Sequence, residues 1–459
     1  MGHLKLFSLL SVASLPFVAS GCGGGNSIGH TTQAITFANP GTQTVGVPLT
    51  LSAEASSDAA VTLSSTTSGV CTVSGTTATF VTAGTCTIDA SQSGNSTYAA
   101  ASQVAQSFTV NPAIGPSTTI YIAGYAIPAV NPPNGVNLAE VWKLTSGSPT
   151  ATATALSMPS GMTSSQAYAI AASGSDVYVA GYAGNSSSQV AVLWVNGTAT
   201  ILPSSMVFSE VGDIAVSGGN VYVTGYEENA AGGGASVLWV NGTHTTLPPP
   251  SGMAYASAGG IAVSGSDVYV TGIAWNTDSD ERAVLWVNGT PTLLPAPSGL
   301  TGDYWASGIA VSGGNVYISG TTSPDVGNDT AISWLNGGAA TTLPIPPNDT
   351  TQGYGTGATA VLGNDVYMTG AGVSSATGST TAAYWLNGTA TSLPLPTNTI
   401  GSPDTSQAHG IAFSGSDVYM VGYVGQYAAY WVNGGAGTLL PMPSGMGYSN
   451  VGGIAVATQ

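Results

Sequence analysis

The sequence predicts an all-β protein in which a β-sandwich is followed by a β-propeller, and three observations lead to this fold class. Only 5% of the 459 residues are charged while 43% are hydrophobic, and Gly alone contributes 64 residues. Such a composition suits short strands joined by Gly- and Pro-rich turns. Apolar and polar residues alternate in short runs between residues 31 and 112. From residue 118 onward, one pattern repeats to the end of the chain.

The first 22 residues have the features of an export signal. Lys5 supplies a positive start, and the apolar stretch of residues 6–18 is too short to span a bilayer. The stretch Val18-Ala19-Ser20-Gly21-Cys22 resembles a bacterial lipobox, which implies a lipid on Cys22, although the family prefers Leu where Ala19 stands. Residues 23–30 then read as a flexible tether. An ordinary cleaved signal peptide is the alternative.

Residues 31–112 alternate in the manner of a β-sandwich of about 80 residues. They contain Cys71 and Cys86, each within a strand-like run, and an even pair of cysteines in an exported protein predicts a disulfide. The segments "ITFANPGTQTVGVPLTLSA", "SGVCTVSGTTATFVTAGTCTIDASQ" and "STYAAASQVAQSFTV" resemble bacterial immunoglobulin-like domains. That resemblance implies a spacer or adhesion module. Residues 113–117 are interpreted as the linker to the repeats.

The repeat combines "GIAVSGSDVYVTGY", a variable loop, "AVLWVNGT" and a Leu-Pro run. The Tyr of its Val-Tyr-Val motif and the Trp of its third strand each occur seven times, at intervals of 44 to 57 residues between tyrosines. This period suits a four-stranded propeller blade. The tyrosines are Tyr121, Tyr178, Tyr222, Tyr269, Tyr317, Tyr367 and Tyr419, and the tryptophans are Trp142, Trp194, Trp239, Trp286, Trp334, Trp385 and Trp431.

The ends of the repeat region predict a closed ring. The first repeat starts at its second strand, residues 118–125, whereas residues 453–456 form a first strand with nothing after it. We therefore expect residues 118–459 to be a seven-bladed propeller closed by the C-terminal strand, since closure removes exposed strand edges. The "GIAV…GNVYVTGY" half resembles bacterial propeller repeats of the SBBP and NHL-like kind, while the "WVNG" half is less typical. In this phase the Ile-Ala-Val strands line an apolar, inert channel.

Loop lengths predict which face of the propeller carries a site. The turns after the first and third strands of each repeat are short and alike, whereas the other two connections are long and variable. Binding residues usually lie on variable loops. Aromatic residues on these loops are expected either to stack on sugars and peptides or to wedge between blades. They are Tyr168, Phe208, Tyr255, Tyr304, Trp305, Tyr354 and Tyr448.

Two further motifs have competing interpretations. Asp278, Asp280 and Glu281 form an acidic loop that is a weak candidate for Ca²⁺, although it lacks the Gly and distal Glu of an EF-hand, and a solvated loop is favoured. The repeated Asn-Gly-Thr matches a glycosylation sequon and also a tight hairpin turn, and the turn is favoured in a bacterial lipoprotein.

Composition narrows the function. With three basic residues and a net charge of −17, the chain is not expected to bind nucleic acid. No catalytic motif is found, so the sequence predicts a protein that is not an enzyme and needs no cofactor. We expect a lipid-anchored protein of the bacterial envelope, in the outer membrane or at the cell surface, that acts as a binding or adhesion module through the variable loops, with carbohydrate or an envelope protein as its partner. A scaffold for an envelope protein is the alternative, and a propeller hydrolase or lyase is the third reading.

Overall fold

The computed structural model describes residues 30–46, 48–111, 118–129, 136–145, 151–299, 301–324, 328–346, 353–373, 379–396 and 405–458. The chain divides into two units, Met1–Gly115 and Pro116–Gln459. The predicted signal segment, Cys22, the tether up to residue 29 and the linker at 113–117 lie outside the described residues. The all-β fold class is confirmed, because every described element is a strand. Among the described residues, we find no helix with the length and apolar character needed to cross a bilayer.

Unit 1 is built from three small sheets. Their strand orders are β1-β4, β2-β9-β8-β5 and β3-β7-β6. Phe80 and Phe108 pack edge to face in its core, with ring centroids 5.9 Å apart. Cys71 and Cys86 form a disulfide bond with a Cα–Cα distance of 5.7 Å. Because Cys71 lies in β6 and Cys86 in β8, this bond joins two of the sheets. The strands are β1 (Ile35–Phe37), β2 (Gln43–Thr44), β3 (Leu49–Thr50), β4 (Ala53–Ala55), β5 (Thr62–Ser65), β6 (Cys71–Ser74), β7 (Thr77–Phe80), β8 (Gly84–Ser91) and β9 (Val104–Asn111).

Unit 2 consists of four-stranded antiparallel arrangements, each with an inner, a second, a third and an outer strand. The inner strands are β13 (Ser164–Ser173), β17 (Phe208–Ser217), β21 (Tyr255–Ser264), β25 (Asp303–Ser312), β29 (Gly353–Leu362), β33 (Ser406–Ser414) and β37 (Met446–Thr458). The second strands are β10 (Thr118–Pro128), β14 (Asp176–Gly184), β18 (Asn220–Glu228), β22 (Asp267–Trp275), β26 (Asn315–Ser323), β30 (Asp365–Val373) and β34 (Asp417–Val424).

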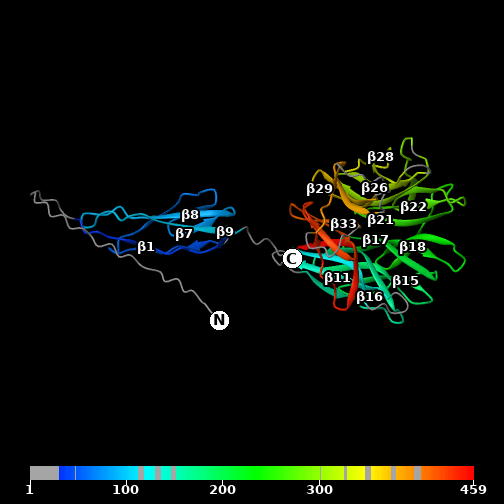
Figure 1. The fold of residues 1–459 in the computed structure, drawn as a ribbon, viewed down its shortest axis with the longest axis horizontal. Helices are drawn as coiled ribbons and strands as arrows, with labels where there is room; N and C mark the ends of the chain where they lie inside the picture. Colours follow the sequence, from blue (N-terminus) through cyan, green and yellow to red (C-terminus); the bar gives the residue numbers. More distant parts are fainter. Residues whose placement is uncertain are drawn as a thin grey trace, which may run out of the picture. The chain divides into compact units, whose positions relative to one another are not determined.

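The third and outer strands complete each arrangement. The third strands are β11 (Leu138–Thr145), β15 (Gln189–Val195), β19 (Gly234–Val240), β23 (Glu281–Val287), β27 (Thr330–Leu335), β31 (Thr380–Leu386) and β35 (Tyr427–Val432). The outer strands are β12 (Thr152–Ala155), β16 (Thr198–Ile201), β20 (Thr243–Leu247), β24 (Thr290–Leu293), β28 (Thr341–Thr342), β32 (Thr389–Ser392) and β36 (Thr438–Leu439). In Figure 1, β17 and β21 lie toward the middle of unit 2, and β16 and β28 lie toward its rim.

The C-terminal strand belongs to the same sheet as the first strand of unit 2. β37 pairs antiparallel with β10 from Thr118↔Thr458 to Pro128↔Met446. It also contacts the inner strands β33 and β13. The other inner strands contact one another in chain order, from β13 through β17, β21, β25 and β29 to β33. The seven inner strands thus follow one another around a common centre.

Each inner strand is interrupted by a β-bulge at the same place. The register shifts lie, for example, between Val211 and Ile214 in β17 and between Ala258 and Ile261 in β21. Neighbouring bulges approach closely, because a Cβ on Gly452 would lie 2.4 Å from the carbonyl oxygen of Tyr168. Side-chain hydroxyls on the second strands donate hydrogen bonds to backbone carbonyls in the bulge of the next inner strand. Ser319, for example, donates to the Gly357 carbonyl at 3.2 Å. The bulges therefore form a tightly packed girdle.

The short turns gather on one face, which we call the turn face. In the β15–β16 turn, Asn196 and Gly197 both have positive φ, 50° and 83°, as a type I′ hairpin requires. The Asn196 amide accepts a bond from the Val177 amide at 2.9 Å and donates one to Asp176 at 2.9 Å. Equivalent bonds recur at Asn241, Asn288, Asn336, Asn387 and Asn433. These Asn-Gly pairs thus form the turns, and their Asn side chains are hydrogen-bonded to the neighbouring hairpin.

Candidate functional site

A cavity of about 400 Å³ lies between the inner strands. Its wall consists of the bulge residues and the Ile or Thr that follows each bulge, and all seven inner strands contribute to it. Most bulge positions hold Gly or Ala, which keeps the centre open. The exceptions with polar side chains are Tyr168, Asp213, Ser307 and His409.

Asp213 and His409 correct the expectation of an apolar, inert channel. The Asp213 carboxylate accepts bonds from the backbone amides of Ile214 at 2.7 Å and Ile261 at 3.2 Å. Burial raises its pKa to about 6, although these two amides oppose the shift. The imidazole of His409 is bonded through Nδ1 to the Val451 carbonyl at 2.8 Å. Burial lowers the pKa of His409, which keeps this imidazole neutral.

A second group of side chains lies near the end of the cavity on the opposite face from the short turns, which we call the variable face. Tyr125, Tyr182, Tyr226 and Tyr423 each follow a Gly near the end of a second strand, and we call them the tyrosine arc. Each pairs across the ladder with a polar residue of the inner strand. The paired residues are Asn450, Gln166, Glu210 and Gln407, respectively.

Ring contacts add further aromatic residues to the arc, mostly within single sheets, and the contact between Tyr226 and Trp275 joins two neighbouring sheets. The ring centroids of Tyr125 and Tyr448 are 6.2 Å apart, and those of Tyr168 and Tyr182 are 5.6 Å apart. At one end, Tyr226 lies 6.2 Å from Trp275, which stacks on Tyr255 at 5.8 Å. Aromatic surface therefore extends over a band of adjacent sheets.

The hydroxyls of the arc stay protonated. Burial, followed by the nearby Tyr448, raises the pKa of Tyr125 to about 12. Burial also raises the pKa of Tyr182, Tyr226 and Tyr423. The Tyr423 hydroxyl donates to the Gln407 side chain at 3.3 Å. The arc thus offers aromatic faces together with amide and hydroxyl groups, and these are the groups that a binding site for a polar ligand needs.

Glu210 is the acidic member of this site. It is half-buried in β17, opposite Tyr226. Burial raises its pKa, and the nearby Glu228 adds to the shift. Tyr182 is close enough for its own pKa to respond to the Glu210 carboxylate. Glu210 is therefore paired with one tyrosine of the arc and affects the pKa of another.

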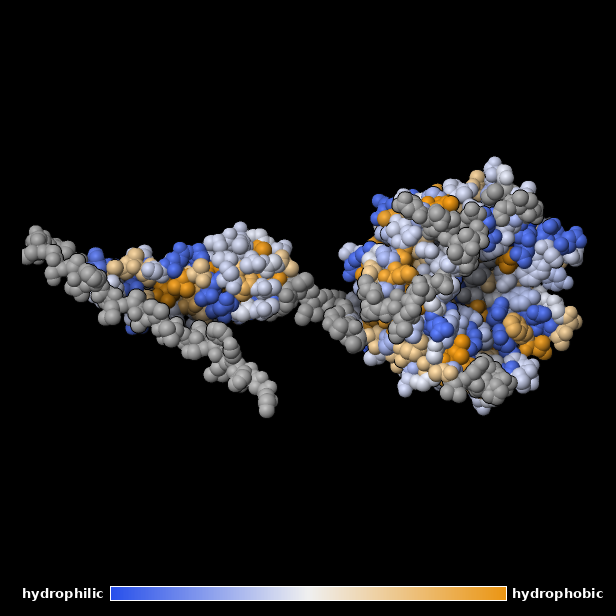
Figure 2. Space-filling view, viewed as in Figure 1, coloured by the Kyte–Doolittle hydropathy of each residue, from blue (hydrophilic) through white to orange (hydrophobic). Residues whose placement is uncertain are grey.

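Two further cavities flank the arc. A cavity of about 800 Å³ is lined by Tyr182, Phe208 and the loop around Asn185–Ser188. A cavity of about 320 Å³ is lined by Ser257, Glu281 and Trp305, among others. On the side of unit 2 seen in Figure 2, hydrophobic residues form separate patches among hydrophilic ones.

The structure brings several of the predicted aromatic residues to this region. Tyr168 lines the central cavity, and its hydroxyl donates to Gln166 at 2.7 Å. Tyr448 contacts Tyr125, and Tyr255 stacks on Trp275. Phe208 and Trp305 line the flanking cavities.

Tyr304 does not belong to the site. It is only 7% exposed, lies in a hydrophobic cluster with Trp334, and donates its hydroxyl to the Leu294 carbonyl at 3.1 Å. The alternative expected from the sequence, a ring wedged between neighbouring sheets, therefore holds for this residue. The side chain of Tyr354 lies outside the described residues.

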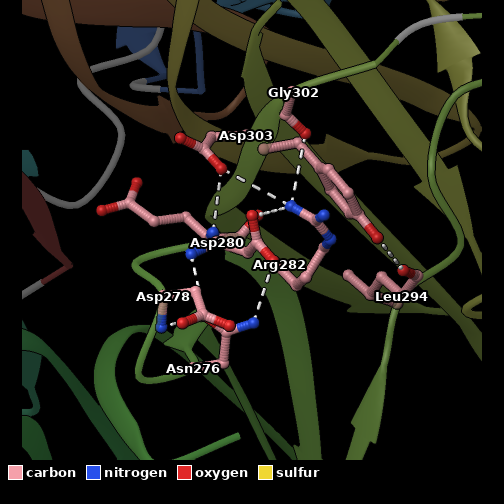
Figure 3. A network of polar contacts seen from close by, with 9 residues as sticks. Asn276, Asp278, Asp280, Arg282, Leu294, Gly302 and Asp303 are labelled. Atoms are coloured by element: carbon pink, nitrogen blue, oxygen red, sulfur yellow. Dashed lines mark hydrogen bonds and ion pairs between the residues drawn. The ribbon is translucent and has the colours of Figure 1, made fainter.

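The acidic loop is a turn held by its own amide. Asn276 accepts bonds from the amides of Asp278 and Asp280, at 2.9 and 3.0 Å, and donates to the Asp280 carboxylate at 2.9 Å. Figure 3 shows this network beside Arg282. No group of three metal-ligating side chains occurs among the described residues, so Asp278, Asp280 and Glu281 are not brought together as Ca²⁺ ligands.

The tyrosine arc, Asp213 and His409 were missed by the sequence interpretation. The Val-Tyr-Val tyrosine and the Trp are kept in all seven repeats, as a core requires. The Tyr after the Gly is kept in four, and Ile273, Thr321 and Ala371 replace it in the others. Selective retention of an aromatic residue is the signal that could have identified the arc. Asp213 and His409 likewise stand where most repeats have Gly or Ala.

No protein-family model and no curated protein matches this chain. Solved structures that it resembles include the β-propeller domain of the Trilobed protease from Pyrococcus furiosus, at 10% identity and a TM-score of 0.41, covering 72% of this chain and 93% of that one. A thermostable family-43 glycoside hydrolase has 10% identity and a TM-score of 0.32, covering 51% of this chain and 94% of that one. The ulvan lyase of family PL25 has 10% identity and a TM-score of 0.37, covering 59% and 81%.

The solved structures with some likeness to this chain thus include a β-propeller domain. They contradict the prediction that the chain is not an enzyme, because the solved structures it resembles include a glycoside hydrolase and a polysaccharide lyase. The absence of a catalytic sequence motif was the wrong criterion, since the side chains on a propeller's axis come from strands far apart in the sequence.

Proposed function

We propose that the chain is an exported protein whose unit 2 is a seven-bladed β-propeller that binds carbohydrate at the tyrosine arc. Seven blades are supported by five four-stranded sheets together with an eight-stranded sheet. Only one parallel bridge, Gln189↔Phe208, links the two halves of that larger sheet, so it counts as two blades. The pairing of β37 with β10 supports closure by the C-terminal strand.

The tyrosine arc is the observation that carries the carbohydrate assignment. Sugar rings present apolar faces edged by hydroxyls, and a flat aromatic ring next to amide and carboxylate groups complements both features. Tyr182 beside Gln166 and Glu210, and Tyr423 beside Gln407, have this arrangement. Tyrosines also lose little conformational entropy on binding, because they have only two side-chain torsions.

The N-terminal part suits display of this site at the bacterial envelope. We propose that Cys22 carries a lipid anchor and that unit 1 is an immunoglobulin-like spacer, so that the chain acts as a surface binding or adhesion protein. The disulfide Cys71–Cys86 supports an oxidising compartment. Fatty-acid labelling of cells should mark the wild-type protein and leave Cys22→Ser unlabelled. Equal labelling of both would exclude the anchor.

A glycan array probed with the full chain tests the assignment. We expect binding to be weakened about tenfold or more, or about 1.4 kcal/mol, in Tyr182→Ala and Tyr226→Ile. Sister repeats hold Ala371 and Ile273 at these positions, so the blades tolerate the replacements. Asp176→Asn on the turn face is the control, because Asn220 and Asn315 occupy the same position. Undiminished binding by both arc variants would exclude this site.

A further inference from the structure

The charges around the tyrosine arc have one sign. Glu210 and Glu228 lie on β17 and β18, and Asp213 lies on the wall of the central cavity. Glu281 lines the flanking cavity next to Trp305. Glu210 and Glu281 are both partly buried, so water screens their charges less than it would screen those of fully exposed carboxylates.

The described basic side chains do not balance these acids. Arg282 donates to the carbonyls of Glu281 at 2.7 Å and Gly302 at 3.3 Å, and lies 3.5 Å from the Asp303 carboxylate. Figure 3 shows its guanidinium directed at Asp303 and Gly302, and it also covers the Tyr304 ring at 5.5 Å. One terminal nitrogen of the guanidinium makes all of these polar contacts, within its own sheet and the next one.

Lys143 is the other described basic residue. It is paired with Tyr121, nearer the turn face than Tyr125 is, and its ammonium lies 5.8 Å from the Tyr121 ring. A ligand at the arc thus meets carboxylates and aromatic rings, and the described basic side chains are either engaged or remote.

We propose that the arc selects glycans with protonated amino groups over neutral and acidic glycans, with Glu210 as the residue that determines this specificity. This inference rests on the proposed carbohydrate site. An ammonium group placed beside Tyr226 would meet the negative face of an aromatic ring and the paired Glu210 carboxylate together. A uronate or sulfate at the same place would meet like charge.

The test compares three oligosaccharides of equal length with the full chain by calorimetry at low ionic strength. They are tetramers of glucosamine, of N-acetylglucosamine and of galacturonate. We expect the glucosamine tetramer to bind about tenfold more tightly than the acetylated one, since an ammonium at a desolvated aromatic site gains roughly that much. The galacturonate tetramer should not bind.

Two variants isolate the role of Glu210. Glu210→Gln should remove the preference for the amine while keeping affinity for the acetylated tetramer, and sister repeats already hold Gln166 and Gln407 there. Asp176→Asn removes the same charge from the turn face and should change nothing. Equal affinity for the amine and its acetylated form, or binding of galacturonate, would overturn the charge selection and leave the carbohydrate site standing. Failure of all three tetramers to bind, together with a silent glycan array, would overturn both.

Discussion

Asp213 stands where the six other inner strands have Gly or Ala, and this replacement has a measurable consequence. Burial raises its pKa from 3.8 to about 6. Because the unfolded chain keeps the ordinary pKa, the folded protein binds the proton more tightly. The stabilisation from this group is therefore complete below about pH 3.8 and is lost as the pH rises through about 6.

Urea unfolding of the wild type and Asp213→Asn at several pH values checks this prediction. The unfolding free energy of the wild type, relative to that of Asp213→Asn, should decrease as the pH increases from about 4 to about 6 and then become constant. The other carboxylates titrate alike in both proteins, so their contributions to the difference in unfolding free energy cancel. An increase in the relative unfolding free energy of the wild type over this range would contradict a raised pKa of Asp213.

At the residue scale, the tyrosine arc could be predicted only in part from the sequence. The repeat pattern identifies Tyr182 and Tyr423 as members of one motif, but linear order separates them by most of unit 2. The pairing of β37 with β10 and its contacts with β33 and β13 bring their sheets to either side of one common sheet. Tyr304 and Trp305 illustrate the converse. Both are predicted on a loop but lie in β25, where alternation buries Tyr304 and directs Trp305 to a flanking cavity.

At the scale of elements, the third strands hold neighbouring sheets together through their tryptophans. All seven side chains are at most 2% exposed. In each described case the indole N–H donates to a backbone carbonyl of the neighbouring sheet, as Trp239 does to Pro203 at 2.7 Å. Trp142 does the same with Pro441 at 2.9 Å, which joins the first and last arrangements in the chain. The Leu-Pro motif therefore supplies an acceptor as well as a strand end.

Trp239→Phe removes the donor and keeps most of the apolar surface. We expect a loss of unfolding free energy on the order of 1–3 kcal/mol, because the fully buried Trp239 loses its hydrogen bond to the Pro203 carbonyl and part of its buried ring. Denaturation in urea measures the loss. Trp275→Phe is the control, since this ring is only partly buried on the variable face, and its effect should be smaller. Equal effects would show that ring volume, not the hydrogen bond, matters.

At the scale of the whole molecule, the repeat count and the two chain ends predict the strand order of unit 2 well. Alternation and turn residues give each hairpin, and the missing first strand predicts the pairing of β37. The bulges are not predictable from this pattern, because Gly and Ala occur both at bulges and in regular strands. Since the bulges decide which side chains reach the cavity, Asp213 and His409 could not be placed without the structure.

Hydrogen–deuterium exchange of the full chain, with and without the glucosamine tetramer, tests the central claim about which face binds. Slower exchange is expected in segments of the variable face, around residues 164–168, 182–189, 208–210 and 448–450, and in no hairpin of the turn face. Protection confined to the turn-face hairpins, such as residues 173–177 and 217–221, would contradict the account.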